Sequence, residues 1–498
     1  MEEASLISET TSTQTWLAFT GYLFMIVMIG IFAARFSSKG LSHYFIGGRK
    51  MNMLVVALSA VVSGRSAWLL LGVTGMAYVM GISAMWAVLG YTIAEFFLFF
   101  YYAPRIRRLS ESYDCITLPD FFSARFGDRG GWLRTMVVGI IVVFMIAYVS
   151  AQFVAGGKAF HSSFQVSETT GLLLTVLIVL FYTMLGGFLA VSLTDTIQGF
   201  FMLAALIVLP MIAISHSGGV SAFWESASGF NDGRFFDPFA LGGAALIGFL
   251  GIGLGSPGNP HIIARYMSIK NPAKLKLVAL VGTVANFFMA LGALATGMAG
   301  RVFFPDASLL PGADPESIYP VMAGHHLHPV LFGVVIASIF AAIMSTADSQ
   351  LLVAASAFVR DIYEKSILKN QEADQRKLVL YSRLAVVFLV VLALFLGLFA
   401  GNIIFWLVLF AWAGLGAAFG PTTILALFWK GTTKAGVMAG MLSGAAVVII
   451  WNRTPFLAEI IYELVPAFMV GLVVTIVVSW FTKTPDHRDA IWRSMSDK

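Results

Sequence analysis

About thirteen apolar blocks, each long enough to form one membrane-spanning helix of roughly 20 residues, divide this sequence. Charged residues make up only 11% of the 498 residues, whereas hydrophobic residues make up 58%. A chain of this composition must meet lipid, so the sequence predicts an all-α integral membrane protein. The blocks cover residues 16–35, 53–79, 83–103, 133–157, 170–190, 193–215, 240–266, 276–300, 329–359, 378–400, 403–429, 434–452 and 458–482.

Most of the 31 lysines and arginines lie in alternate connections between the blocks and in the tail of residues 483–498. Arg265 is counted here with the cluster of Lys270, Lys274 and Lys276. Because basic residues gather on the cytoplasmic side, we expect the N terminus outside and the C terminus inside a plasma (inner) membrane. This sorting accounts for the net charge of +5 without a nucleic-acid partner. The acidic start of the chain is not typical of a signal peptide, so the first block is predicted to be retained.

Two of the blocks contain polar interruptions within their apolar runs. Residues Ser63–Trp68 read Ser-Gly-Arg-Ser-Ala-Trp, and Gly253–Pro260 contain three glycines and two prolines. Irregular backbone within a membrane is tolerated only where it faces protein or a water-filled cavity, so these breaks point to a functional site. Asn259 followed by Pro260 is typical of a helix cap and a first helical position. Simple Gly/Pro kinks are the alternative interpretation.

Broken helices five blocks apart predict a transporter built from two inverted repeats, with its site between the breaks. We expect residues 53–215 and 240–429 to form these repeats within a single transmembrane domain spanning residues 1–498. One additional helix precedes the first repeat, and two follow the second.

Four ionisable residues lie inside predicted spans, where a charge is costly and therefore a functional candidate. They are Arg65, Glu95, Asp195 and Asp348. Ser345, Asp348 and Ser349 share one helical face, and their oxygens are hard ligands suited to Na⁺. Asp348 is interpreted either as a cation ligand or as the ion-pair partner of Arg65. No partner is predicted for Glu95.

The sequence has no Walker loop, nucleophile elbow, zinc-protease motif or dinucleotide fingerprint in a suitable context. We therefore expect no enzyme activity and no cofactor, and an ion gradient as the driving force. The expected partners are a small organic solute, Na⁺ as the coupling ion, and membrane lipid.

Several sequence motifs resemble those of the solute:sodium symporter family, and most closely its sodium/proline symporter branch. The motifs are HYFIGGR (residues 43–49), ALSAVVSGRSAWLLLG (57–72), LPDFFSARF (118–126), YTMLGGFLAVSLTDTIQ (182–198), PHIIARYM (260–267), IMSTADSQLL (343–352) and WAGLGAAFGP (412–421). The resemblance implies a thirteen-helix LeuT-type fold, alternating access, and inward movement of Na⁺ with the solute.

The resemblance also implies site residues, position by position. The principal Na⁺ site would use the backbone carbonyls of Val62, Arg65 and Ala342 with the hydroxyls of Ser345 and Thr346. A second cation or proton site would use Asp195, Asp348 and Ser349. The substrate would contact Ser66, Trp68, Gly72, Tyr148, Ser256 and Pro260.

The chain departs from the branch at both broken helices. Gly64 replaces an aspartate, Arg65 replaces an apolar residue, and Ile252 and Ser256 replace aromatic residues that would pack on a proline ring. The predicted solute is therefore a proline-like amino acid or another carboxylate-bearing metabolite, and Arg65 is a candidate ligand for its carboxylate. One alternative is a proton-coupled or sodium-independent carrier in which Arg65 replaces the cation. A remote alternative is a membrane sensor of solute.

Overall fold

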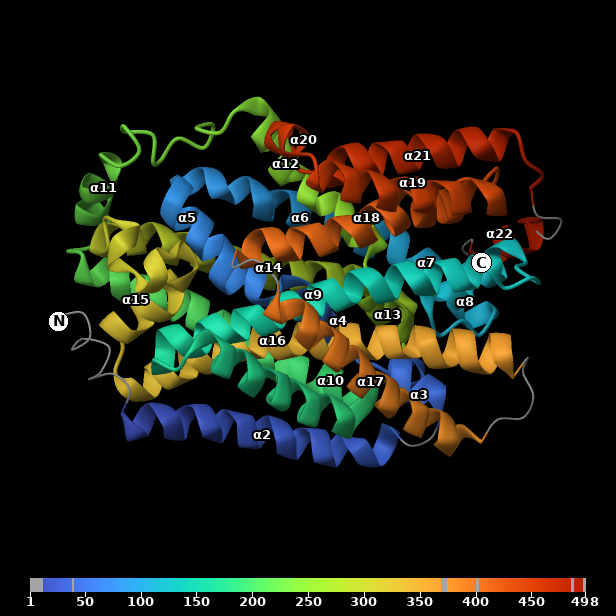
Figure 1. The fold of residues 1–498 in the computed structure, drawn as a ribbon, viewed down its shortest axis with the longest axis horizontal. Helices are drawn as coiled ribbons and strands as arrows, with labels where there is room; N and C mark the ends of the chain where they lie inside the picture. Colours follow the sequence, from blue (N-terminus) through green and yellow to red (C-terminus); the bar gives the residue numbers. More distant parts are fainter. Residues whose placement is uncertain (1–11, 38–39, 369–373, 400–402, 485–487, 496–498) are drawn as a thin grey trace.

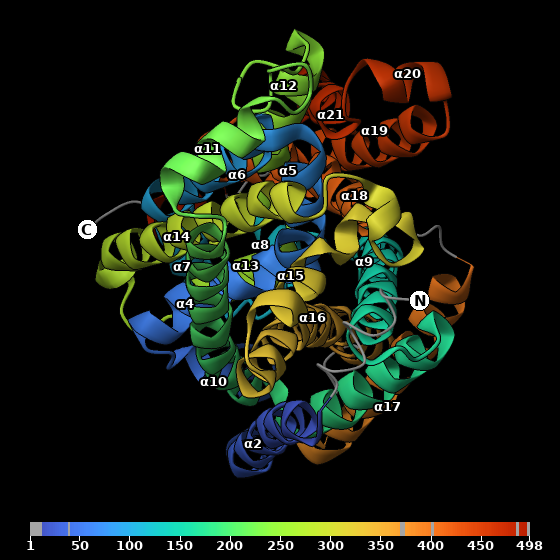
Figure 2. The same cartoon turned by 90° about the vertical axis from the view of Figure 1, so that its left-hand side faces the viewer.

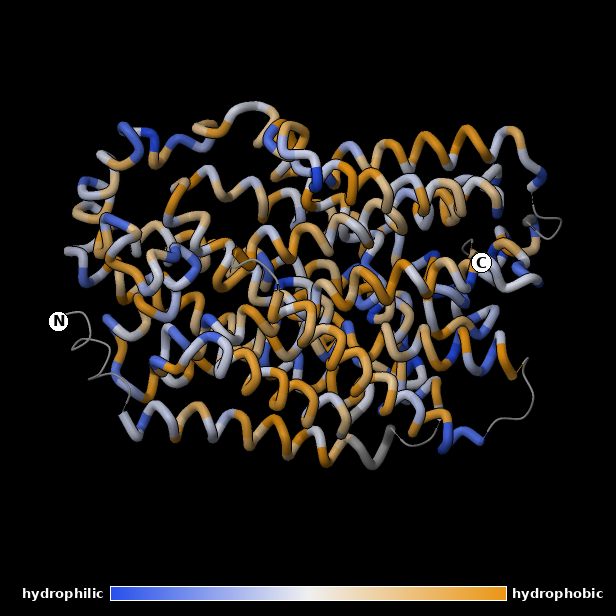
Figure 3. The backbone as a smooth tube through the Cα atoms, viewed as in Figure 1, coloured by the Kyte–Doolittle hydropathy of each residue, from blue (hydrophilic) through white to orange (hydrophobic). Residues whose placement is uncertain are grey.

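The protein is described here by a computed structural model of residues 12–37, 40–368, 374–399, 403–484 and 488–495. Helices account for nearly all of its regular structure, and they form one elongated bundle (Figure 1). Hydrophilic residues gather toward the two ends of this bundle, and hydrophobic residues cover the length between them (Figure 3). This distribution is the one expected of helices that cross a bilayer. The prediction of an all-α membrane protein is confirmed.

The first half of the bundle begins with α2, which packs on its outside against α10 and α16. The helices of this half are α2 (Thr13–Ser37), α3 (Leu41–Ile46), η1 (Gly47–Arg49), α4 (Met53–Ala67), η2 (Trp68–Val73), α5 (Thr74–Met80), η3 (Gly81–Ala84), α6 (Met85–Phe97), η4 (Leu98–Tyr102), α7 (Ala103–Ser112), α8 (Leu118–Phe126), α9 (Trp132–Phe164) and α10 (Glu168–His216).

The second half follows a surface helix, α11 (Val220–Ser228). Its helices are α12 (Gly243–Gly251), η5 (Ile252–Gly258), α13 (Pro260–Ser268), η6 (Pro272–Lys274), α14 (Leu275–Phe303), η7 (Ala307–Leu309), η8 (Pro311–Ala313), η9 (Pro315–Ser317), α15 (Ile318–His326), α16 (Pro329–Ser356), η10 (Ala357–Ile367), α17 (Gln375–Leu398) and α18 (Ile404–Phe428). The C-terminal helices are α19 (Lys434–Asn452), α20 (Pro455–Ile460), α21 (Leu464–Trp480) and α22 (Arg488–Met495).

Nine helical stretches of the described chain are long and apolar enough to cross a membrane. One of them, Met53–Ser112, is 60 residues long and contains two predicted blocks. The chain reverses direction in this stretch near Gly81, whose φ of 64° is readily adopted only by glycine. Three shorter apolar helices, Glu168–Met184, Gly243–Gly258 and Leu464–Trp480, match further blocks. The count of thirteen spans stays a prediction.

The structure corrects one predicted boundary. Residues 170–190 and 193–215 are predicted as separate helices, and the structure places the break between them at Gly187, within a helical run from Glu168 to His216. Gly187 has φ 61° and ψ −173°, a conformation that glycine adopts readily and other residues adopt only with strain. The two segments therefore join without a loop.

Both predicted helix breaks are present. In α4, Ser66 has φ 53° and ψ −171°, which interrupts the helix in the middle of the bundle. In the second half, η5 ends at Gly258, Asn259 is extended, and α13 begins at Pro260. Asn259 lies at the predicted cap position, but its Nδ2 donates to the Gly255 carbonyl at 2.8 Å and its side chain does not cap α13.

Helices α9, α10, α16 and α18 surround these breaks. Helix α16 packs against α4, α9, α10 and α13, and α18 packs against η5 and α9. The end-on view places α16 among α9, α10 and α2, with α13 nearer the centre (Figure 2). The side chains at the breaks are therefore enclosed by protein on all sides.

Candidate functional site

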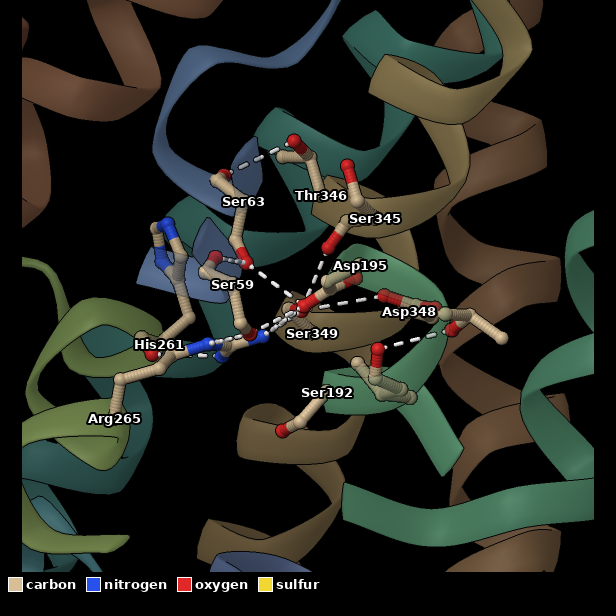
Figure 4. A network of polar contacts seen from close by, with 12 residues as sticks. Ser59, Ser63, Ser192, Asp195, His261, Arg265, Ser345, Thr346, Asp348 and Ser349 are labelled. Carbon is tan, nitrogen blue, oxygen red and sulfur yellow. Dashed lines mark hydrogen bonds and ion pairs between the residues drawn. The ribbon is translucent and has the colours of Figure 1, made fainter. Parts of the chain in front are cut away.

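A buried carboxylate, Asp195 of α10, lies where α4, α10, α13 and α16 meet (Figure 4). Its Oδ2 accepts hydrogen bonds from Ser59 Oγ at 2.6 Å and Ser63 Oγ at 3.2 Å, both on α4. Arg265 of α13 approaches the same oxygen, with Nη2 3.0 Å away. Both partners of this ion pair are almost fully buried, with side chains 1% and 0% exposed.

The position of Arg265 corrects its assignment to a cytoplasmic connection. Helix α13 continues to Ser268, which carries the guanidinium into the protein interior. Arg265 Nε donates to Ser59 Oγ at 3.1 Å, Nη1 donates to the His261 carbonyl at 2.8 Å, and Nη2 also contacts Ser349 Oγ. One arginine thus connects the two broken helices, α10 and α16.

A second buried carboxylate, Asp348, lies beside this cluster on α16 (Figure 4). Its Oδ1 accepts from Ser349 Oγ at 3.2 Å. Three buried oxygens here, Asp348 Oδ2, Asp195 Oδ1 and Ser192 Oγ, have no hydrogen-bond partner among the described residues. Buried polar atoms are nearly always bonded, so this group of free oxygens is suited to a bound cation, water or proton.

The residues of the predicted principal Na⁺ site come together at the break in α4. Thr346 Oγ1 donates to the Ser63 carbonyl at 3.0 Å, which joins α16 to α4. Ser345 Oγ donates to the Ala342 carbonyl at 3.1 Å, and Val62 and Ala342 are fully buried. Hydroxyl and carbonyl oxygens in such an arrangement can replace the hydration shell of Na⁺.

The backbone at this break is held by side chains from other helices. Ala67 N donates to Gln152 Oε1 of α9 at 3.2 Å. The Arg65 carbonyl accepts the amide of Trp68, so one of its two lone pairs stays available for a cation. The non-helical Ser66 between them is a strained conformation of the kind that clusters at ligand sites.

The structure pairs Arg65 with Glu95, so the predicted Arg65–Asp348 ion pair is wrong. Arg65 Nη2 lies 3.0 Å from Glu95 Oε2 on α6, and Nε donates to Asn286 Oδ1 on α14. The guanidinium also covers the Tyr91 ring, with Cζ 3.3 Å from the ring centroid. The charge of Arg65 is therefore balanced away from Asp195 and Asp348, and Glu95 has a partner.

Gly64 has a packing reason in this fold. A Cβ added at Gly64 would lie 2.2 Å from the hydroxyl oxygen of Tyr91. The hydroxyl of α6 thus occupies the space that a longer side chain would need. Tyr91 therefore contacts both neighbouring positions: its hydroxyl requires a glycine at position 64, and its ring lies against the guanidinium of Arg65.

The predicted substrate-contacting residues are buried around the two breaks. Trp68 stacks on Phe405 of α18 with ring centroids 5.7 Å apart, and a Cβ on Gly72 would meet the same phenylalanine at 3.2 Å. Tyr148 makes an edge contact with His261. The polar groups without a partner in the described chain include Trp68 Nε1 and Ser256 Oγ, while Ser66 and Pro260 are fully enclosed. Phe405 is absent from the sequence prediction because it lies in a uniformly apolar run.

The short helix η9 carries a second feature that the sequence did not reveal. Lys158 Nζ of α9 lies 2.6 Å from Asp314 Oδ2 and 2.7 Å from Glu316 Oε2. Glu316 also accepts the amides of Ile404 and Phe405, at 2.9 Å and 2.7 Å, in the first turn of α18. Burial raises the pKa of Glu316, and Lys158 and these amides oppose the shift. Glu316 thereby fixes the start of the helix whose Phe405 covers Trp68.

This fold and site define a multi-pass membrane transporter with two broken helices that meet at a polar centre. The sequence profile described as "Sodium:solute symporter family" matches residues 44–444. The chain belongs to the sodium:solute symporter family, whose members are Na⁺-coupled transporters of the plasma membrane.

Relatives and solved structures agree with this assignment. The sodium/proline symporters of Staphylococcus aureus strains JH9 and NCTC 8325 are each 38% identical over 488 residues, covering 95% of this chain and 93% of theirs. A Na⁺-coupled sialic acid symporter in a substrate-bound outward-open state shares the fold, with a TM-score of 0.81 and 18% identity over 95% of this chain and 99% of its own. A nucleobase-cation-symport-1 family transporter in a closed conformation matches with a TM-score of 0.55 and 12% identity. The match covers 92% of this chain and 99% of that transporter. The predicted LeuT-type fold is confirmed.

Proposed function

We propose that this protein carries a small organic solute into the cytoplasm together with Na⁺, by alternating access. The hydrogen bond from Thr346 Oγ1 to the Ser63 carbonyl is the observation that carries the proposal, because it brings α16 onto the interrupted part of α4. In the proposed principal site, Na⁺ binds the carbonyls of Val62, Arg65 and Ala342 and the hydroxyls of Ser345 and Thr346.

Coupling follows from the position of this site between two helices. A cation that bridges α4 and α16 favours the conformation in which the two are close, and that conformation also places Ser66 and Trp68 for the solute. Each ligand then raises the affinity for the other by the same factor. We propose Asp195, Asp348 and Ser349 as a second position of positive charge, because two of their oxygens lack partners within the described structure.

The proposed solute is a proline-like amino acid or another carboxylate-bearing metabolite. The sodium/proline symporters among the relatives support the first choice. The solute would lie against Ser66, Trp68, Gly72, Tyr148, Ser256 and Pro260, with Arg65 nearby. Arg65 Nη1 has no partner among the described residues, so the N–H groups of this nitrogen are left to donate to a solute carboxylate.

The alternative of a carrier in which Arg65 replaces the cation is not favoured, since Glu95 already neutralises Arg65. The proposed orientation keeps the N terminus outside. Lys158, Asp314 and Glu316 would then close the extracellular side, and α7, α8 and α22 would lie in the cytoplasm.

Solute uptake into proteoliposomes tests the proposal. Proline and a panel of amino acids and carboxylates are offered with an inward Na⁺ gradient, with equal Na⁺ on both sides, and with K⁺ in place of Na⁺. We expect accumulation above equilibrium only with the Na⁺ gradient. Equal uptake in all three conditions would refute Na⁺ coupling, and uptake driven by a proton gradient alone would support the alternative.

A further inference from the structure

The guanidinium of Arg265 already occupies two of the oxygens at the proposed second position. Nη2 contacts both Asp195 Oδ2 and Ser349 Oγ, two of the three residues of the proposed second position. Nε takes the Ser59 hydroxyl, which itself donates to the same Asp195 oxygen. A cation that used Asp195 Oδ2 or Ser349 Oγ would therefore compete directly with a side chain of the protein.

Formal charge limits how many cations this region accepts. Arg65 and Glu95 neutralise each other, and Arg265 neutralises Asp195, which leaves one negative charge on Asp348. One Na⁺ brings the buried region to zero net charge. A second Na⁺ would leave an unpaired positive charge away from water, which is strongly unfavourable.

We infer that Arg265 acts as a tethered cation at the second position, so that the transporter binds one Na⁺ and not two. The inference rests on the proposed Na⁺-coupled symport. Arg265 is a positioning residue here: it holds Asp195, Ser59 and Ser349 as a dissociable ion would, but it stays in place when Na⁺ leaves.

The attachment of the arginine to its own helix supports this role. Nη1 donates to the His261 carbonyl one turn earlier in α13, so the guanidinium moves with the half-helix that follows the second break. Its other donors reach α4, α10 and α16. The tethered charge therefore connects both broken helices to their neighbours in this conformation.

Counting bound Na⁺ tests the inference. Binding of radioactive Na⁺ alone to the purified full-length protein gives the number of ions per chain and the Hill coefficient. We expect one ion and a Hill coefficient of about 1 for the wild type. Arg265→Gln adds one uncompensated negative charge, so we expect two ions and a coefficient near 2. Arg265→Gln combined with Asp348→Asn restores the original net charge and should return the count to one.

Two further variants complete the test. Arg265→Lys keeps the charge and should bind one ion. Arg125→Gln is the matched control, because Arg125 is also fully buried but donates through Nε to the Ala426 carbonyl and lies on α8, away from the cluster. It should also bind one ion.

The outcomes separate this inference from the proposed function. Two Na⁺ on the wild type would overturn the inference and leave Na⁺-coupled symport intact. A single ion on a folded Arg265→Gln protein would also overturn it. Absence of Na⁺ binding to the wild type would overturn the proposed function itself, and the inference with it. Where Arg265→Gln does not fold, a wild-type count of two still overturns the inference, and Arg265→Lys tests whether charge at this position keeps the count at one.

Discussion

Arg65 of α4 and Glu95 of α6 form a buried ion pair, with Nη2 3.0 Å from Oε2, directly before the bend at Ser66. Both side chains lie out of contact with water, at 0% and 4% exposure. The pair fixes the first broken helix to a neighbour that does not contribute to the proposed Na⁺ site. It also removes one positive charge from the balance around Asp195 and Asp348.

Removal of one partner should destabilise the protein strongly. Glu95→Gln leaves Arg65 buried without a counter-charge, and breaking such a pair costs about 3–5 kcal/mol. Arg65→Met combined with Glu95→Gln removes both charges and should regain most of this loss. Thermal unfolding of the wild type, Glu95→Gln and the double variant in detergent gives the comparison. A double variant that unfolds as early as Glu95→Gln would contradict the ion-pair interpretation. Arg234→Gln, which breaks an exposed pair with Asp237, is the control and should cost less than about 1 kcal/mol.

Substitution at Gly64 should depend on Tyr91. In Gly64→Ala the new Cβ would meet the Tyr91 hydroxyl, and such overpacking costs about 1–3 kcal/mol. Tyr91→Phe removes the obstructing oxygen, so the double variant should be more stable than Gly64→Ala alone. The measurement is the unfolding temperature of the two single variants and the double variant. Strictly additive losses would show that the hydroxyl is not the obstacle.

Loss of the Thr346 hydroxyl should weaken Na⁺ binding. Thr346→Val keeps the shape of the side chain but removes a proposed ligand, and a loss of about 1.4 kcal/mol would raise the Na⁺ concentration for half-maximal uptake roughly tenfold. Thr346→Ser retains the oxygen and should stay close to the wild type. Thr296→Val is the control, because within the described structure that buried hydroxyl bonds only to the Gly292 carbonyl of its own helix. Equal shifts in the valine variants would argue against a special role for Thr346.

Titration of Glu316 should give a measurable pH dependence of stability. Burial raises its pKa in the folded protein above the ordinary value of 4.5. Its stabilising contribution is therefore complete below the unfolded value and is lost as pH rises through the higher folded value. Glu316→Gln removes this titration, so the unfolding free energy of the wild type should fall relative to the variant as pH increases from about 4.5 upward.

Asp306 provides a control of opposite sign for that experiment. Its pKa is lowered by the backbone amide of Ser308, so its contribution is present above its unfolded pKa and is lost as pH falls. Asp306→Asn should thus change the pH profile in the other direction. Profiles for Glu316→Gln and wild type that run parallel would contradict the role of Glu316.

The breaks in the two helices could be predicted from sequence because their causes are local. Proline lacks an amide donor and glycine tolerates unusual backbone angles. The residues of Gly253–Pro260 therefore predict a helix break on their own. Ser66 is similar, since Gly64 and two serines interrupt an apolar run. The shared face of Ser345, Asp348 and Ser349 follows equally from helical spacing.

The ion pairs could not be predicted, because they depend on which helix faces meet. Glu95 lies 30 residues from Arg65, and Asp195 lies 70 residues from Arg265. The sequence offers Asp348 either as a cation ligand or as the partner of Arg65, because spacing alone does not show which helix faces meet. Arg265 was assigned to a loop because the apolar signal fades in α13, a half-helix of 9 residues whose burial comes from its neighbours.

The Arg65–Glu95 pair also has a consequence for how the chain enters the membrane. An arginine near the centre of a lone helix raises the cost of insertion by about 2.5–3.5 kcal/mol. Its counter-charge is synthesised only 30 residues later, after the turn at Gly81. The segment that contains α4 and the segment that contains α6 can share this cost only if they insert together as a helical hairpin. Because of the Arg65–Glu95 pair, we therefore expect these two segments to enter the membrane together and not one after the other.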